Sequence, residues 1–154
     1  MDAVSFAYPC GQTFVGKGVD TKSYIPLIAA SFESGRGWLD EGANVPMVCD
    51  MAQLTGMEID GKTFDQVKAI IDAARSSGKW IIFAGHEMDE GGRQITSLST
   101  LEELCKYAMD PANGIWIDNV HNIAAYLRAK RGDAPVSSLH PLQQSRAQKK
   151  VTEK

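Results

Sequence analysis

A continuous apolar run between two glycines constrains the fold of this chain more than any other feature. Residues 80–84 are all apolar, and the run lies between Gly78 and Gly85. A strand with one solvent-exposed face would alternate polar and apolar side chains, whereas an unbroken run is typical of a strand covered on both faces, as in parallel sheets. The sequence therefore favours a parallel sheet between helices.

Strand and helix patterns alternate along the rest of the chain. Short apolar segments predict strands at Val4–Tyr8, weakly around Trp38, at Trp80–Ala84 and at Ile115–Ile117. Helical spacing and capping residues predict helices from Ser23 to Gly35, over Thr63–Ser77, from Ser99 onward with Glu102 completing a capping box, and after Asp118 or Asn119. We expect glycine-rich loop over Gly11–Asp20 and mostly loop over Arg36–Lys62. This order predicts an α/β fold of parallel βα units.

Length and charge limit the class of protein. The chain has 154 residues, 44% hydrophobic side chains and a formal net charge of -3, which fits one globular domain with a real core. No apolar run approaches the roughly 20 residues that a membrane-spanning helix needs. With 16 basic and 19 acidic side chains, no long-range attraction for nucleic acid is expected. We therefore expect a soluble protein with no nucleic-acid or membrane partner and a disordered polar tail over residues 132–154.

The three cysteines do not have the close spacing of a zinc site. Cys105 falls on the apolar face of a predicted helix, so we expect it in the core. Cys10 and Cys49 both follow strand-like segments, so a disulfide between them stays open at this stage.

The strongest candidate for chemistry is His86, in the segment Gly85-His86-Glu87 after the most buried strand. In parallel βα folds the loops after the strands form the site, and a histidine there can donate or accept a proton near neutral pH. We predict His86 as the catalytic residue and Glu87 as a substrate contact; the alternative is a histidine that only holds a loop. His121 and His140 are expected at the surface and in the tail, so a metal shared with His86 is not expected.

The turn Tyr8-Pro9-Cys10-Gly11 follows the first strand and is a second candidate. Proline and glycine hold such a turn tightly, and a backbone N–H there can bind an oxyanion. A plain strand-ending turn is the alternative. Cys10 is also a candidate nucleophile with His86 as its base.

Arg36, Trp38 and Glu41 follow the weak strand. The arginine is a candidate for orienting a carboxylate and the tryptophan for stacking on a sugar ring. The alternative is a tryptophan in the core beside a surface arginine.

Three segments together resemble the later motifs of polysaccharide deacetylases, the NodB-type carbohydrate esterases. They are, in the same order as in that family, Phe6–Gly11, Trp80–Glu87 and Gly114–Val120. The resemblance covers about residues 3–131 and implies a partial (β/α) barrel, truncated at the N-terminus, because a full barrel takes about 250 residues. It implies that residues 1–131 are the C-terminal half of a hydrolase that removes N- or O-acetyl groups from a carbohydrate polymer.

The same resemblance implies roles for particular residues. His86 matches the histidine that protonates the departing amine, and the Tyr8 to Gly11 turn matches the segment that helps to hold the oxyanion. In the family a divalent metal, zinc or similar, is held by an aspartate and two histidines and activates water. The motifs that carry these ligands lie N-terminal to the matched region and are not found in this chain, and Ala7 stands where many members carry an arginine. Members often work outside the cytoplasm, but the sequence itself does not predict a location.

Three functions are therefore weighed. The first is a deacetylase-like hydrolase whose site is incomplete in this chain, and the second is a non-catalytic α/β module that binds carbohydrate or is structural. The third is a thiol hydrolase that uses Cys10 and His86. Because an open half-barrel exposes a strand edge and an apolar face, we expect a homodimer or association with a missing N-terminal half.

Overall fold

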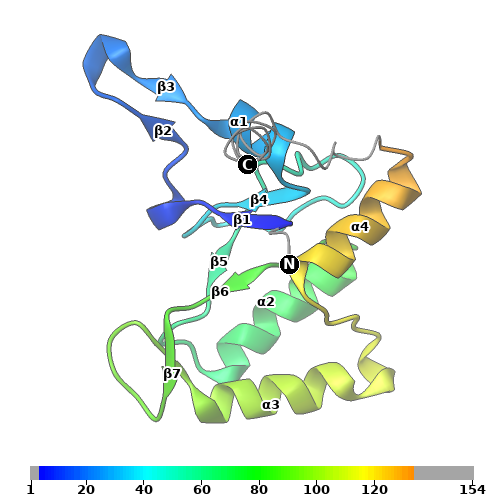
Figure 1. The fold of residues 1–154 in the computed structure, drawn as a ribbon. Coiled ribbons are helices and arrows are strands. Elements are labelled where there is room, and N and C mark those ends of the chain that lie inside the picture. The colour runs from blue at the N-terminus through cyan, green and yellow to red at the C-terminus, as the bar shows by residue number, and fades with distance from the viewer. Residues whose placement is uncertain (1–3, 134–154) are drawn as a thin grey trace, which may run out of the picture.

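The computed structural model describes residues 4–133, which form a mixed α/β structure (Figure 1). Its α-helices are α1 (Ile25–Ser31), α2 (Phe64–Ser76), α3 (Leu98–Met109) and α4 (Val120–Arg131). Its strands are β1 (Ser5–Ala7), β2 (Phe14–Val15), β3 (Lys22–Ser23), β4 (Ser34–Arg36), β5 (Met57–Glu58), β6 (Phe83–Ala84), β7 (Glu87–Asp89) and β8 (Ile95–Ser97). Three single turns of 3-10 helix lie at Pro9–Gly11, Gly18–Asp20 and Pro111–Asn113.

The central strands run parallel and follow one another in chain order. β1 pairs with β4, and β5 pairs with β6. A parallel bridge between Arg36 and Leu54 joins β4 to the segment that leads into β5. The described residues therefore form a mixed α/β structure with short ladders, and the predicted fold of parallel βα units stays a prediction. Among residues 4–133 the strands do not close into a barrel, and a partial barrel stays a prediction.

Both faces of the segment around β6 are covered by helices. Ile81 and Phe83 join the core cluster under α2 and α3, together with Ile59. Trp80 and Ile82 point the opposite way and pack against α4. This alternation explains the apolar run of residues 80–84, since one face is buried against α4 and the other is partly buried under α2 and α3. The predicted association with a second copy or a missing half stays a prediction.

Two helices begin at the residues that the sequence predicts. The side chain of Thr63 accepts a hydrogen bond from the Gln66 N–H, and the side chain of Gln66 accepts one from the Thr63 N–H at 2.9 Å, a complete capping box for α2. Asn119 caps α4 by accepting from the Asn122 N–H at 2.9 Å. Gly132 ends α4 in the left-handed conformation.

Two arginines of α4 anchor the helix to the N-terminal end of the strands. Arg128 donates to the carbonyl oxygen of Glu33, directly before β4, at 2.7 Å and 3.0 Å. Arg131 donates to the carbonyl oxygens of Pro46, at 2.7 Å, and Cys49, at 2.9 Å. These side chains therefore satisfy carbonyls of other segments as well as suiting the negative end of the helix.

The predicted strand Ile115–Ile117 does not form within the described residues. Ile117 is 53% exposed, and the segment lies across two hollows from the residues around β6, so its backbone has no ladder partner. A strand needs such a partner for its N–H and C=O groups, which an apolar sequence alone does not supply.

The predicted register of α3 is also corrected. The helix begins after Ser97, whose hydroxyl lies 2.8 Å from the Ser99 hydroxyl, and the predicted capping box of Ser99 and Glu102 does not form. Leu104 and Ala108 are buried as expected, but Cys105 is exposed. Two buried positions four residues apart define a narrow stripe, and Cys105 lies just outside it.

Several short elements fall in segments predicted as loop. β2 and β3 form an antiparallel hairpin within and just after Gly11–Asp20, and Figure 1 shows it projecting from the body. β5 lies in the predicted loop Arg36–Lys62. The weak strand predicted around Trp38 does not form among the described residues: β4 ends at Arg36 and begins within the segment predicted as helix. The first helix ends at Ser31 rather than at Gly35. Strands of two or three residues are too short to show a periodicity in the sequence.

The described residues include no helix that is long and apolar enough to cross a membrane. The polar tail predicted for residues 132–154 lies outside the described residues, apart from 132 and 133.

Candidate functional site

The segments that follow the parallel strands meet at one end of the sheet. Trp38, after β4, lies edge-on to the His86 ring, with ring centroids 4.8 Å apart. A β-carbon added to Gly11, in the turn after β1, would lie 3.2 Å from the carbonyl oxygen of Trp38. The structure therefore brings three sequence-predicted segments together at the ends of β1, β4 and β6, the end where sites of parallel βα folds form.

The centre of this site is a pairing of His86 with Asp60, the second residue after β5. Nδ1 of His86 lies 2.7 Å from Oδ2 of Asp60, and the backbone N–H of His86 donates to the same oxygen at 3.1 Å. The Asp60 side chain is only 3% exposed, whereas the His86 side chain is 42% exposed. A buried carboxylate thus holds one edge of an imidazole whose other edge reaches solvent.

Thr96, on β8, completes the surroundings of the carboxylate. Its hydroxyl donates to Oδ1 of Asp60 at 2.6 Å. Burial raises the pKa of Asp60, but the hydrogen bonds from Thr96 and His86 outweigh it and lower the pKa below its ordinary value. Asp60 is therefore ionised near neutral pH. An ionised carboxylate only accepts hydrogen bonds, so the 2.7 Å contact places a proton on Nδ1 of His86.

His86 lines a cavity of about 500 Å³. The amide nitrogen of Gln94 lies 3.5 Å from Nε2 of His86. Polar residues at the mouth of the cavity include Glu87, Asp118 and Asn119, and its wall is made by apolar residues of β6 and α3. Polar groups around an apolar wall are typical of small-ligand sites.

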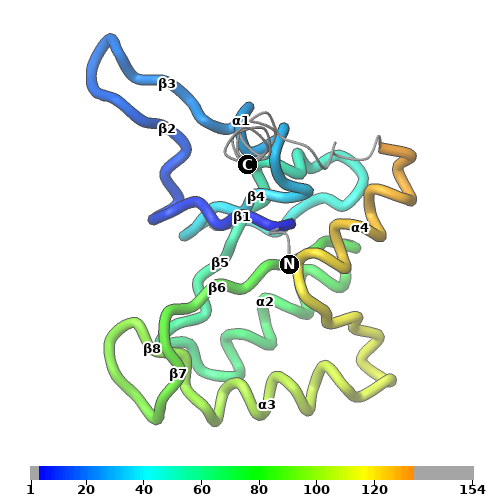
Figure 2. Tube along the Cα trace, viewed as in Figure 1, coloured from blue at the N-terminus to red at the C-terminus, as the bar shows by residue number. Residues whose placement is uncertain are grey.

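Asp60, Thr96 and Gln94 were not predicted from the sequence. The available signal was Asp60 itself, which follows an apolar residue, Ile59, and precedes Gly61, as at the end of a strand. This signal is weak because β5 has only two residues, too few to show the pattern of a strand in the sequence. Thr96 and Gln94 come from a segment, β7 to β8, for which no strand was predicted; Figure 2 shows these two strands side by side.

The turn after β1 has mixed roles. Tyr8 is 2% exposed and donates its hydroxyl to the carbonyl oxygen of Ala52 at 2.8 Å, so it supports the turn from the core, where burial raises its pKa. Pro9 and Cys10 are exposed. The N–H of Gly11 is used within the turn, by the Tyr8 carbonyl oxygen. Among the described residues the N–H of Cys10 has no hydrogen-bond partner, so it is the donor in this turn available to an oxyanion.

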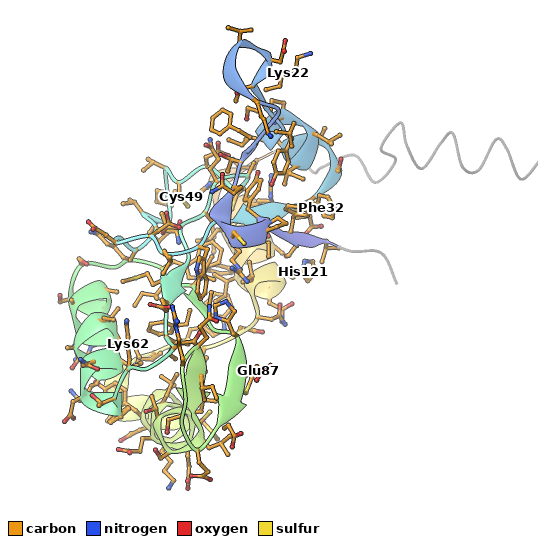
Figure 3. The ribbon with its side chains drawn as sticks, turned by 90° about the vertical axis from the view of Figure 1, so that its left-hand side faces the viewer. Lys22, Phe32, Cys49, Lys62, Glu87 and His121 are labelled. Atoms are coloured by element: carbon orange, nitrogen blue, oxygen red, sulfur yellow. The ribbon has the colours of Figure 1, made fainter. Side chains whose placement is uncertain are left out.

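The remaining predicted residues lie around the imidazole or behind it. Arg36 is half-buried, its pKa is lowered by burial, and its Nη1 donates to the Gly37 carbonyl oxygen at 3.1 Å. Trp38 is half-buried with its ring against His86. Glu87 is exposed at the start of β7, on the face of the molecule that Figure 3 turns toward the viewer.

The cysteines show no pairing. All three are free, including Cys10 and Cys49, whose disulfide was left open by the sequence. Within residues 4–133, the Cys10 thiol makes no hydrogen bond to His86. The sulfur of Cys49 instead accepts from Arg131 at 2.9 Å.

The described residues contain no group of three His, Cys, Asp or Glu side chains placed to hold a metal ion. The residues around His86 therefore do not fit the divalent metal that the resemblance implies, and no chemical step is assigned to such a metal.

Comparisons of the chain with protein-family models, with curated proteins and with solved structures found no match.

Proposed function

We propose that this chain carries the proton-transferring part of a polysaccharide deacetylase-like hydrolase, which removes acetyl groups from a carbohydrate polymer. One observation carries the proposal: the buried Asp60 carboxylate holds Nδ1 of His86 at 2.7 Å, while the imidazole stays 42% exposed beside a cavity. A histidine that only tied down a loop would not need its own buried carboxylate. The resemblance of three segments to deacetylase motifs supports the same role.

The chemical step assigned to His86 is proton donation from Nε2. In its imidazolium form the ring gives this proton to the nitrogen of an N-acetyl group as the C–N bond breaks, and the electron pair of that bond stays on the departing amine. Asp60 stabilises the imidazolium through Nδ1–H, as the aspartate of a catalytic triad does. Activation of the attacking water, which the resembling family assigns to a metal, is assigned to none of residues 4–133.

The surroundings of His86 suit a sugar substrate. Trp38 presents an aromatic ring beside the imidazole, and aromatic rings pack well on the apolar faces of sugars. Glu87, Asp118 and Asn119 supply hydrogen-bonding groups for hydroxyls at the mouth of the cavity. The N–H of Cys10 can hold the acetyl oxygen in the proposed complex.

Acetate release from acetylated chitin or peptidoglycan fragments, measured with the purified chain and added zinc or cobalt, tests the proposal. We expect His86→Ala to lower the rate by about 10²-fold or more, the usual contribution of a general acid. His121→Ala is the matched control, because His121 is also 42% exposed and also pairs with a carboxylate, that of Glu33. Acetate release that survives His86→Ala, or acetylated fragments that leave the NMR signals of His86 unshifted, overturns the proposal.

A second candidate is a non-catalytic carbohydrate-binding module. It is favoured by the formed cavity, whose lining includes His86, Asp118 and Asn119. It predicts that the same fragments shift the NMR signals of Trp38 and His86 and that no acetate appears.

A further inference from the structure

The Asp60 carboxylate is held by donors from two parts of the chain. Oδ2 accepts from Nδ1 of His86 at 2.7 Å and from the His86 N–H at 3.1 Å. Oδ1 accepts from the Thr96 hydroxyl at 2.6 Å and only distantly, at 3.3 Å, from the His86 N–H. Without the Thr96 hydroxyl, one oxygen of this buried carboxylate would keep only that long contact.

We infer that Thr96 is a positioning residue, which holds the Asp60 carboxylate in the orientation that fixes His86 as its Nδ1–H tautomer. The inference concerns the imidazole itself, and its consequence for catalysis rests on the proposed function. Thr96 lines the same cavity as His86 but makes no hydrogen bond to the imidazole, so its effect on the tautomer is exerted through Asp60.

The residue type at position 96 supports this role. Thr96 is 3% exposed, and among the described residues its hydroxyl hydrogen-bonds only to Asp60. Valine has the same shape and would fill the same space without placing a hydroxyl in the interior, which is unfavourable unless the hydroxyl is bonded. The hydroxyl is therefore explained by the carboxylate that it binds, and not by packing.

The backbone at Gly85 packs closely against both side chains. A β-carbon on Gly85 would lie 2.5 Å from Oγ1 of Thr96 and 2.8 Å from Oδ1 of Asp60. The pairing of β7 with β8, in which Met88 lies opposite Thr96, brings the threonine back beneath the residue that precedes His86. The segment from β7 to β8 thus places both Thr96 and Gln94 beside the Asp60–His86 pair.

Nitrogen-15 NMR of the imidazole tests the inference, because the shifts of Nδ1 and Nε2 report which nitrogen carries the proton. We expect the Nδ1–H form in the wild-type chain and a majority of the Nε2–H form in Thr96→Val, since an imidazole without a fixed carboxylate prefers the latter. Thr96→Ser restores the hydroxyl and should restore the Nδ1–H form. Thr100→Val is the matched control: Thr100 is also buried, but its hydroxyl donates to the carbonyl oxygen of Lys62 at 3.1 Å.

A Thr96→Val chain that keeps the Nδ1–H form overturns the inference. If this variant does not fold, Thr96→Ala replaces it, because alanine removes the hydroxyl without adding volume. Retention of the Nδ1–H form in either variant contradicts the inference. The measurement needs no substrate. A tautomer shift in Thr96→Val, in a chain whose acetate release survives His86→Ala, upholds the role of Thr96 and rejects the proposed hydrolase. Acetate release that depends on His86, with an unshifted Thr96→Val tautomer, rejects the role of Thr96 alone.

Discussion

Gly85 lies so close to Thr96 that a β-carbon on the glycine would meet the threonine hydroxyl at 2.5 Å. Thr96 cannot move away easily, because it is buried and its hydroxyl is bound to Asp60. The close packing of Gly85 against Thr96 and Asp60 therefore requires a glycine before His86.

Gly85→Ala should destabilise the fold by about 1–3 kcal/mol, the usual cost of overpacking a tight interior. Urea unfolding measures this free energy. Gly91→Ala is the control, since a β-carbon at Gly91 would meet nothing within 4 Å. Equal stability of the two variants would contradict the close packing of Gly85 against Thr96.

The stability that Asp60 provides should depend on pH. Although burial raises the pKa of Asp60, hydrogen bonds from Thr96 and His86 lower it overall, so the folded chain binds a proton here less readily than the unfolded chain. The stabilisation is then fully present above the unfolded carboxyl pKa of about 4 and is lost as the pH falls through the lower folded value.

Wild type and Asp60→Asn compared by urea unfolding at pH 7 and at about pH 3 measure this dependence. We expect the wild type to exceed the variant in free energy of unfolding at pH 7, and the gap to narrow in acid. Asp20→Asn, at an exposed position in the projecting hairpin, should show no such gap. A gap that widens in acid would contradict the ionised state of Asp60.

The attachment of α4 depends on Arg131. Its side chain is 9% exposed and serves the carbonyl oxygens of Pro46 and Cys49. Arg131→Ala leaves these oxygens without a donor and should lower the free energy of unfolding by about 1–3 kcal/mol. Lys130→Ala, one residue away and exposed, should have a much smaller effect in the same thermal or urea unfolding experiment. Similar losses in both variants would show that α4 is not anchored in this way.

Two neighbouring residues of α3 test the corrected helix register. Leu104 is 7% exposed, and Cys105 is exposed. Leu104→Ala should cost roughly 2–5 kcal/mol of stability through the cavity that it leaves. Cys105→Ser should change stability by less than about 0.5 kcal/mol, as surface substitutions usually do. Slow reaction of Cys105 with a thiol reagent in the folded chain would instead support the core position first expected for it.

Much of the secondary structure was predictable because its signals are local. The capping box of Thr63 and Gln66 marks the start of α2, and Asn119 marks the start of α4, since a cap is made by residues three apart in the sequence. The failures have a common cause. Ile115–Ile117 has the composition of a strand but lacks a ladder partner among residues 4–133. β5 has a partner, but its two residues are too few to show a pattern in the sequence.

For the candidate site, the sequence by itself determined that His86 follows a strand covered on both faces and that it stands at the end of the sheet where the loops meet. Only the tertiary structure decided which carboxylate it meets. Asp60 lies 26 residues earlier and Thr96 ten residues later, and nothing local relates the three. They come together because parallel pairing of β5 with β6 aligns the ends of those strands and β8 folds back beneath them. Such contacts depend on strand register, which is set by packing across the whole chain and not by any one segment.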